Sequence, residues 1–136
     1  LLHLVYFQLN SKANISIDFS AFDEISFNTA YMKSIFLNLL TNAIKYAKPD
    51  QLPVITIQSK VADGIKQLIF SDQGSGFDMD KVKDKIFGLY EKFHNNHDSN
   101  GIGLYLVYNH VTNLGGRIAV ESKLNEGATF TISFKY

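Results

Sequence analysis

The residues of this 136-residue chain that are best suited to bind a ligand lie in a segment that is otherwise patterned as an apolar helix. At about 100° per residue, one stripe of this helix carries only polar side chains: Ser34, Asn38, Asn42 and Lys45. The apolar residues cluster away from this stripe and are expected to face the core: Phe36, Leu37, Leu39, Leu40, Ala43, Ile44 and Ala47.

The stripe has two interpretations. The first is an ordinary solvated helix face. The second starts from the two asparagines, because Asn is a mediocre helix former and solvent faces usually favour Glu, Lys or Gln. Two amide oxygens four residues apart can bind a hard cation that also holds phosphate oxygens. Lys45 would then add a point charge for phosphate.

The same helix lacks a general base. Asn28 is a good N-cap, so the helix is predicted to run from there to about Ala47, and Pro49 ends it. Between Asn28 and Pro49 there is no Asp or Glu. The helix therefore carries no carboxylate that could activate a water molecule.

A first glycine segment, Asp72-Gln-Gly74-Ser-Gly76-Phe77, follows a predicted strand. Asp and Gly are common in tight turns, where Asp72 would simply accept a local backbone hydrogen bond. The functional alternative is that Asp72 accepts from an exocyclic amine of a ligand, while the glycines allow the ligand to approach the backbone.

A second glycine segment, Gly101-Ile102-Gly103-Leu104, opens a predicted helix. Helix N-termini present free amides, so a phosphate is physically reasonable there. The segment is not a P-loop, because no Gly-Lys-Ser/Thr follows it. It also lacks the parallel strand–loop–helix unit of a dinucleotide-binding fingerprint.

Composition excludes several other functions. The chain has 13 basic and 13 acidic residues, so a broad basic face for nucleic acid is not expected. It has no cysteine, which excludes disulfides and thiolate nucleophiles. The four histidines show no metal-ligand spacing. No apolar run approaches about 20 residues, so no membrane span is predicted.

Apolar–polar alternation predicts strands at 15–19, 25–27, 54–58, 65–70, 117–122 and 129–134. Besides the helix from residue 28, we expect a short helical turn at 79–85 and a helix at 101–114. Residues 62–64 carry a hairpin signal, and residues 125–127 join the last two strands. This mixed order favours an α+β fold.

Taken in order, five segments of the chain resemble the sequence boxes of sensor histidine kinases. They are an N box at 38–46, a glycine box at 72–76, an F box at 86–93, a second glycine box at 101–104 and a closing Gly-x-Thr-x-Phe segment at 127–130. The resemblance covers about residues 14 to 135. It implies the Bergerat fold shared with DNA gyrase and MutL ATPases, a two-layer sandwich. Its mixed, mostly antiparallel sheet carries about three helices on one face.

The resemblance also implies roles for individual residues. Asn42 would ligate Mg²⁺, and Asn38 would lie beside the phosphates or the metal's water shell. Lys45 would reach a phosphate, Tyr46 would flank the adenine and Asp72 would accept from the adenine amine. The further nucleotide contacts implied are Gly74, Gly76, Phe77, Phe93, His94, Gly101, Ile102, Gly103, Leu104 and Thr129.

The chain differs from many members of the family in the basic residues of the lid, where those kinases carry an arginine. The stretch from the F box through the lid, at about 93–100, contains no arginine. Its basic residues are Lys92, His94 and His97. The charge of the transition state would therefore rest more on Mg²⁺ and on Lys45 or Lys92. Together with Asn38, these two lysines are the expected catalytic residues. The lid lacks apolar residues after Phe93 and is expected to move when no nucleotide is bound.

The implied activity is that of a sensor protein histidine kinase. ATP, or ADP as product, would be held with Mg²⁺, and the γ-phosphoryl group would go to a histidine on a separate dimerisation domain. Gyrase-like hydrolases place a Glu where this chain has Asn38. His3 does not resemble the family's acceptor, so the chain alone is not expected to autophosphorylate. The alternatives are an anti-sigma-factor-type serine kinase and a non-catalytic nucleotide- or partner-binding module.

Two domain assignments follow. Residues 1–12 are expected to be the remnant of a linker helix from a dimerisation domain, and 13–136 to be the ATP-binding catalytic domain. The expected partners are the dimerisation and histidine phosphotransfer domain of the same parent kinase and, indirectly, a response regulator. We expect a cytoplasmic domain without nucleic-acid or membrane contacts, although the parent could be membrane-anchored. The isolated fragment is expected to be a monomer.

Overall fold

The computed structural model describes residues 13–82, 86–87 and 100–134. Five strands form one sheet in the order β1-β2-β3-β5-β4. The strands are β1 (Asn14–Asp18), β2 (Val54–Ala62), β3 (Ile65–Asp72), β4 (Arg117–Ser122) and β5 (Ala128–Ser133). The helices of the described residues are α2 (Thr29–Lys45), α3 (Met79–Val82) and α5 (Asn100–Asn113).

The sheet is mixed and mostly antiparallel, as expected. β1 pairs with β2 in parallel, with Ile15 opposite Ile55, and the other three pairings are antiparallel. The predicted hairpin between β2 and β3 is confirmed. Its two turn residues, Asp63 and Gly64, have φ values of 52° and 80°, the left-handed pair that tight hairpins favour.

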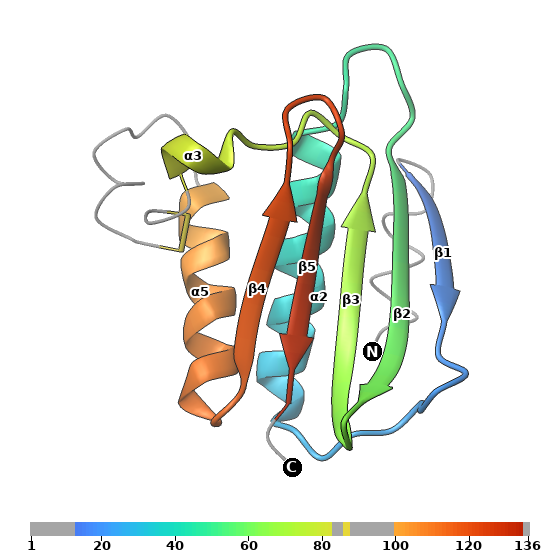
Figure 1. The fold of residues 1–136 in the computed structure, drawn as a ribbon, viewed down its shortest axis with the longest axis vertical. Helices are drawn as coiled ribbons and strands as arrows, with labels where there is room; N and C mark the ends of the chain where they lie inside the picture. Colours follow the sequence, from blue (N-terminus) through green and yellow to red (C-terminus); the bar gives the residue numbers. More distant parts are fainter. Residues whose placement is uncertain (1–12, 83–85, 88–99, 135–136) are drawn as a thin grey trace.

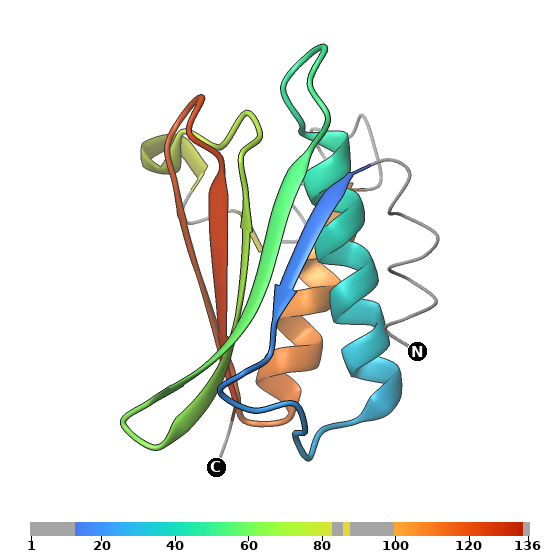
Figure 2. The same ribbon diagram turned by 90° about the vertical axis from the view of Figure 1, so that its right-hand side faces the viewer.

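Helices α2 and α5 cover one face of the sheet, which gives the molecule two layers (Figures 1 and 2). Alternate strand residues face these helices and are buried: Ile55, Ile57, Leu68, Phe70, Phe130 and Ile132. The helices contribute Ile35, Leu39, Leu40, Leu104, Val107 and Val111 to the same core. This two-layer α+β arrangement is the Bergerat fold that the sequence predicts.

Helix α2 begins and ends close to the predicted positions, but its buried face is rotated. Asn28 caps it, because its Oδ1 accepts from the Tyr31 backbone N–H at 2.9 Å. Leu37, expected in the core, is 41% exposed, whereas Asn42, expected on the polar stripe, is only 5% exposed. The reason is that α5 packs against the flank of α2, so the buried arc turns from the sheet toward that neighbour.

The strand expected at 25–27 is wrong, since this segment is irregular. Asp18 Oδ1 accepts from the Ser20 N–H at 2.9 Å, in a turn directly after β1. Ile25 and Phe27 nevertheless pack against the core from this connection. The Phe27 ring meets the Phe134 ring edge-on at 5.1 Å. Their alternation therefore reflects packing without a strand partner.

The predicted linker-helix remnant at 1–12 lies outside the described residues, as does most of the F box and lid. Among the helices that the structure describes, none combines the length and apolar character that crossing a bilayer requires.

Candidate functional site

Three segments distant in sequence meet at one end of the sheet: the C-terminal end of α2, the glycine segment after β3 and the β4–β5 turn (Figure 1). Two backbone hydrogen bonds join them. The Ser75 N–H donates to the Tyr46 carbonyl at 2.9 Å, and the Asn125 N–H donates to the Ser75 carbonyl at 2.7 Å. This end therefore brings the N box and the first glycine box together.

Asp72 is held as a hydrogen-bond acceptor at the end of β3. Its Oδ1 accepts from the Gly74 N–H at 2.9 Å, so the local-turn interpretation is correct as far as it goes. Burial raises the pKa of Asp72, and the backbone N–H groups of Gly74 and Ala128 oppose this shift. A carboxylate has about four acceptor positions, so these contacts leave capacity for a ligand amine.

The glycine segments at this end have little room for side chains. Gly76 and Gly127 have φ values of 69° and 82°. A Cβ on Gly76 would overlap the Lys123 carbonyl oxygen, and one on Gly74 would lie 2.6 Å from the Tyr46 carbonyl oxygen. Neighbouring backbone therefore leaves no room for a side chain at these positions, which explains why they are glycines.

Two serines in this region were missed in the sequence. Ser122 Oγ donates to the Gly127 carbonyl at 2.6 Å and accepts from the Phe77 N–H at 2.8 Å. Ser71 Oγ lies 3.1 Å from Thr129 Oγ1, which fixes the hydroxyl predicted at the adenine end. The only signal for the Ser71–Thr129 pair would have been cross-strand register, which needs the fold first.

Aromatic rings flank the same end. The Tyr46 and Phe77 rings meet edge-to-face with centroids 6.1 Å apart. Tyr46 remains 38% exposed, so one part of the pair is open to a ligand. Tyr46 and Phe77, which were predicted from different segments of the sequence, therefore lie together on one side of the candidate site.

Asn42 carries the most unusual polar atom of the described residues. Its Oδ1 is buried and finds no hydrogen-bond partner among them. Leaving a buried acceptor unsatisfied costs roughly 1–3 kcal/mol, so such an atom requires an explanation. A neutral amide oxygen is a ligand type that Mg²⁺ accepts. No cluster of three or more His, Cys, Asp or Glu residues within the described ranges could hold a metal instead.

Asn38 lies one turn before Asn42 and faces the start of α5. Its Nδ2 donates to the Ser34 carbonyl at 2.8 Å and to Ser34 Oγ at 3.0 Å. A Cβ on Gly103 would lie 2.8 Å from Asn38 Oδ1. The N box and the second glycine box are therefore in contact.

The other predicted site residues divide into three groups. Gly101 and Ile102 lie in the first turn of α5, and Lys45 lies in the last turn of α2. Leu104 is a core residue, 2% exposed, so any ligand contact from it would use its backbone. Three predicted contacts fall outside the described residues: Lys92, Phe93 and His94.

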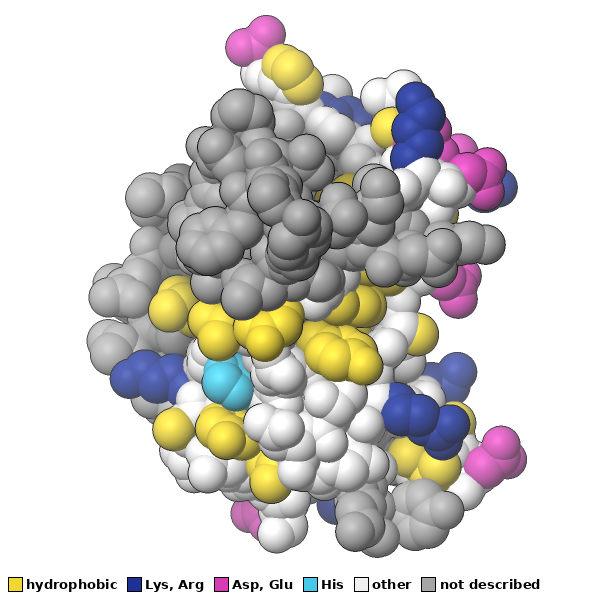
Figure 3. Space-filling model, turned by 90° about the vertical axis from the view of Figure 1, so that its left-hand side faces the viewer, with side chains coloured by type: hydrophobic (Ala, Val, Ile, Leu, Met, Phe, Trp, Pro, Cys, Tyr) yellow, Lys and Arg dark blue, Asp and Glu magenta, His cyan; other side chains and the backbone are white. Residues whose placement is uncertain are grey.

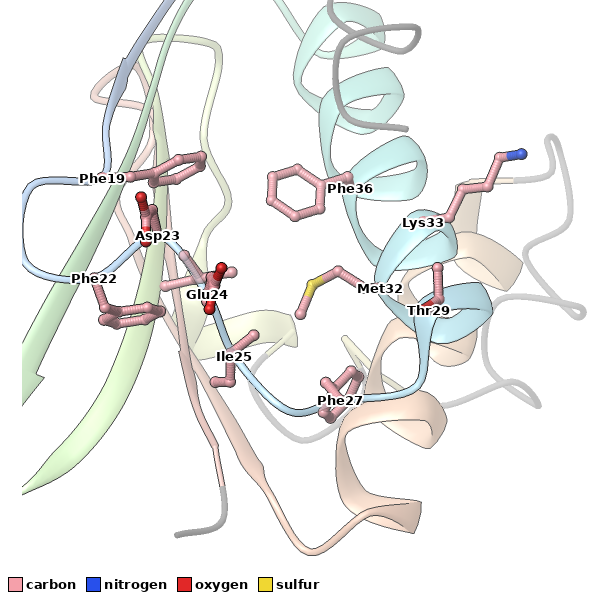
Figure 4. A pocket seen from close by; sticks show the side chains of 11 residues that line it. Phe19, Phe22, Asp23, Glu24, Ile25, Phe27, Thr29, Met32, Lys33 and Phe36 are labelled. Atoms are coloured by element: carbon pink, nitrogen blue, oxygen red, sulfur yellow. The ribbon is translucent and has the colours of Figure 1, made fainter.

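A larger cavity lies away from this end. A cavity of about 240 Å³ lies at the opposite end of α2, between the helix and the β1–α2 connection (Figure 4). Its walls include Phe19, Phe22, Ile25, Met32 and Phe36. A cavity of only about 20 Å³ lies beside Asp72 and is also lined by Ala43 and Ala47. We place the candidate site by the buried and half-buried acceptors at this end, because the polar residues that line the larger cavity are all exposed: Asp23, Glu24, Thr29 and Lys33.

Comparison with known proteins shows the family to which the chain belongs. Residues 28–136 match the model of the histidine kinase-, DNA gyrase B- and HSP90-like ATPase family. The chain is 32% identical to the sensor protein RprX of Bacteroides fragilis over 107 residues, which cover 76% of the chain. It is 34% identical to the heme sensor protein HssS of Staphylococcus saprophyticus over 79% of the chain. It spans only 20% and 23% of the lengths of these curated relatives.

Solved structures support the same fold. The mycobacterial sensor histidine kinase MprB matches with a TM-score of 0.78 at 19% identity, covering 98% of this chain and 89% of that one. Full-length ShkA, solved in complex with AMPPNP, matches with a TM-score of 0.79 at 23% identity, covering 98% of this chain and 28% of that one. The chain belongs to the histidine kinase-, DNA gyrase B- and HSP90-like ATPase family, as an ATP-binding catalytic domain of the histidine kinase type.

Proposed function

We propose that the chain binds ATP or ADP with Mg²⁺ and supplies the γ-phosphoryl group to a histidine on a separate dimerisation domain. The observation that carries the proposal is Asn42 Oδ1, a buried amide oxygen without a hydrogen-bond partner among the described residues. A ligand that supplies its missing partner would offset the cost of that burial.

At the base end of the site, Asp72 accepts from the adenine amine. The Gly74 and Ala128 N–H groups hold the carboxyl, and its remaining acceptor positions are available to the ligand. The open edge of Tyr46 flanks the base, and Thr129 contributes its hydroxyl group. A site that hydrogen-bonds an exocyclic amine discriminates strongly against bases that lack one, because the buried acceptor would then stay unpaired.

At the phosphate end, Asn42 holds Mg²⁺, which would neutralise charge on the phosphate oxygens. Asn38 and Gly103 lie beside the phosphates, and Lys45 adds a positive charge from the last turn of α2. Phosphoryl transfer depends mainly on positioning and charge neutralisation, so no nucleophile is needed within this site. Lys92 in the lid is a further candidate cation.

The acceptor lies elsewhere. Helix α2 has no Asp or Glu, so it offers no general base for water, and ATP is kept for an external nucleophile. Hydrophobic side chains gather in a band on the side of the molecule where α5 lies (Figure 3). Leu106 and Tyr108 of α5 are 37% and 41% exposed. Such exposed apolar area fits contact with a dimerisation domain of the same parent kinase.

Calorimetric titration with ADP, with and without Mg²⁺, tests the proposal. We expect measurable affinity that falls about 10- to 100-fold in Asp72→Ala, the range for losing a hydrogen bond to a charged group. Asp23→Ala, an exposed carboxyl at the far end of α2, is the matched control and should bind normally. No binding by the wild-type chain, or full binding by Asp72→Ala, would refute the assignment.

Incubation with ATP labelled at the γ-position tests the location of the acceptor. The chain alone should remain unlabelled, and a histidine-bearing dimerisation domain should become labelled when added. Label on His3 of the isolated chain would contradict the proposal that the acceptor is on a separate domain.

A further inference from the structure

The geometry points to Ser34 and His110 as a pair of positioning residues that fix the orientation of Asn38. We propose that a hydrogen-bonded chain runs from Asn38 through Ser34 to His110 and aims the Asn38 amide oxygen at the phosphate end of the site. This inference rests on the proposed function, because it concerns how one residue of that site is held.

The orientation of the Asn38 amide is determined by its partners. The Ser34 carbonyl can only accept, so the atom facing it at 2.8 Å must be the amide nitrogen. The same nitrogen lies 3.0 Å from Ser34 Oγ, so it donates to two oxygen atoms of one residue. The amide oxygen is therefore left facing Gly103 at the start of α5.

Ser34 Oγ continues the chain into the second helix. Because it accepts from Asn38, its own hydrogen is free to be donated, and His110 Nε2 lies 3.1 Å away. A neutral imidazole with its proton on Nδ1 accepts this hydrogen at Nε2. Burial lowers the pKa of His110, which favours the neutral ring.

The plane of the His110 ring is fixed from α2. The ring stacks on the Tyr31 ring, with centroids 4.3 Å apart and planes 24° from parallel. Tyr31, Ser34 and Asn38 follow one another at helical spacing, so a single face of α2 builds the whole arrangement. His110 is thus clamped by a residue one turn before the serine that it contacts.

Two points of contact tie α5 to this face of α2. Gly103 approaches Asn38 Oδ1, and His110, two turns later on the same helix, contacts Ser34. Gly103 allows α5 to come close to Asn38. His110 contacts Ser34, which in turn holds the Asn38 side chain. The relative position of the two helices and the orientation of Asn38 are therefore linked.

The test compares variants that remove the chain with variants that keep it. Ser34→Ala and His110→Leu remove it, whereas Ser34→Thr keeps the hydroxyl group and His110→Gln keeps an acceptor. We expect the first pair to weaken Mg²⁺–ATP binding about three- to ten-fold, the range for one hydrogen bond, and the second pair to bind nearly normally. AMP affinity should be unchanged in all four, because AMP lacks the β- and γ-phosphates that Asn38 would face.

Asn38→Ala provides the background that identifies the mechanism. If Ser34 and His110 act through Asn38, then Ser34→Ala and His110→Leu should cause no further loss when Asn38 is already Ala. Additive losses in that background, or an equal fall in AMP affinity, would overturn the inference.

Failure of the proposed function can be recognised separately. The side-chain amide resonances of Asn38 should shift in Ser34→Ala without nucleotide, since they report its hydrogen bonds directly. Shifted resonances combined with normal Mg²⁺–ATP affinity in Asn38→Ala would refute the role of Asn38 while keeping its positioning by Ser34. Unshifted resonances would refute the positioning itself.

Discussion

The two ends of helix α2 differ in how the space around them is used. At the C-terminal end, backbone packs against backbone: Gly74 approaches the Tyr46 carbonyl so closely that a Cβ would lie 2.6 Å from it. At the N-terminal end, α2 faces an apolar cavity of about 240 Å³ (Figure 4). Met32 and Phe36 point into that space from the helix.

The comparison shows that the larger cavity and the candidate site lie at opposite ends of α2 in this fold. The crowded end holds a half-buried carboxyl group and an amide oxygen without a partner among the described residues. The spacious end offers mainly phenylalanine, isoleucine and methionine side chains. Precise positioning of polar atoms needs tight packing around them, so the tighter end is the better place for catalysis.

The largest effect should come from adding one methyl group at the crowded end. Gly76→Ala places a Cβ against the Lys123 carbonyl at a positive φ, and we expect it to lower the free energy of unfolding by about 3 kcal/mol or more. Urea denaturation measures this loss.

Gly64→Ala is the matched control for Gly76→Ala. Gly64 also has a positive φ, 80°, but nothing lies within 4 Å of its added Cβ. It should cost only the conformational strain, about 1–2 kcal/mol. Equal losses in the two variants would show that crowding does not distinguish this end.

Asn42→Leu should separate stability from ligand binding. It replaces a buried amide, whose oxygen has no partner among the described residues, by an apolar side chain of similar shape, so we expect unchanged or higher stability, by about 1 kcal/mol. The gain in ADP affinity caused by Mg²⁺ should fall about ten-fold, as expected for a lost charge-assisted contact.

Asn113→Leu, at the exposed end of α5, controls for the Asn42 substitution and should change neither quantity. A clear loss of stability in Asn42→Leu would mean that the amide is satisfied in the native protein. The C-terminal end of α2 would then no longer differ from the N-terminal end by an amide oxygen without a partner.

Much of this contrast was foreseeable from local sequence. The N-cap at Asn28, the end of α2 near Pro49 and the Asp63–Gly64 hairpin were predicted because each depends on a few adjacent residues. The sequence boxes placed Asp72 and the two asparagines on elements that the fold does bring to one end.

The parts that failed or were missed depend on distant partners. Burial of Asn42 and exposure of Leu37 follow from α5, about 60 residues later in the chain, and no helical wheel contains that neighbour. Ile25 and Phe27 alternate like a strand because they pack on the core, not because they pair. The Ser34–His110 contact joins residues 76 positions apart.

Filling the cavity tests the spacious end. Met32→Phe should raise the free energy of unfolding by about 1 kcal/mol, because the larger side chain enters empty apolar space. ADP affinity should stay unchanged. Leu37→Phe, on the exposed side of the same helix, is the control and should give no such gain in thermal melts. A loss of stability in Met32→Phe would mean that this end is packed as tightly as the other.

The smallest expected effect is a pH dependence at Asp72. Burial raises the pKa of Asp72 in the folded chain above its ordinary value of 3.8, so folding favours the protonated form. The stability from this preference is present below pH 3.8 and is lost as the pH rises through the folded pKa. Asp72→Asn keeps an acceptor for the Gly74 N–H but cannot ionise. Its stability advantage over wild type, measured by urea denaturation, should therefore be larger at pH 7 and shrink on acidification. An advantage that grows in acid would instead mean that the folded chain stabilises the carboxylate, and the crowded end would then hold its charge at no cost to stability.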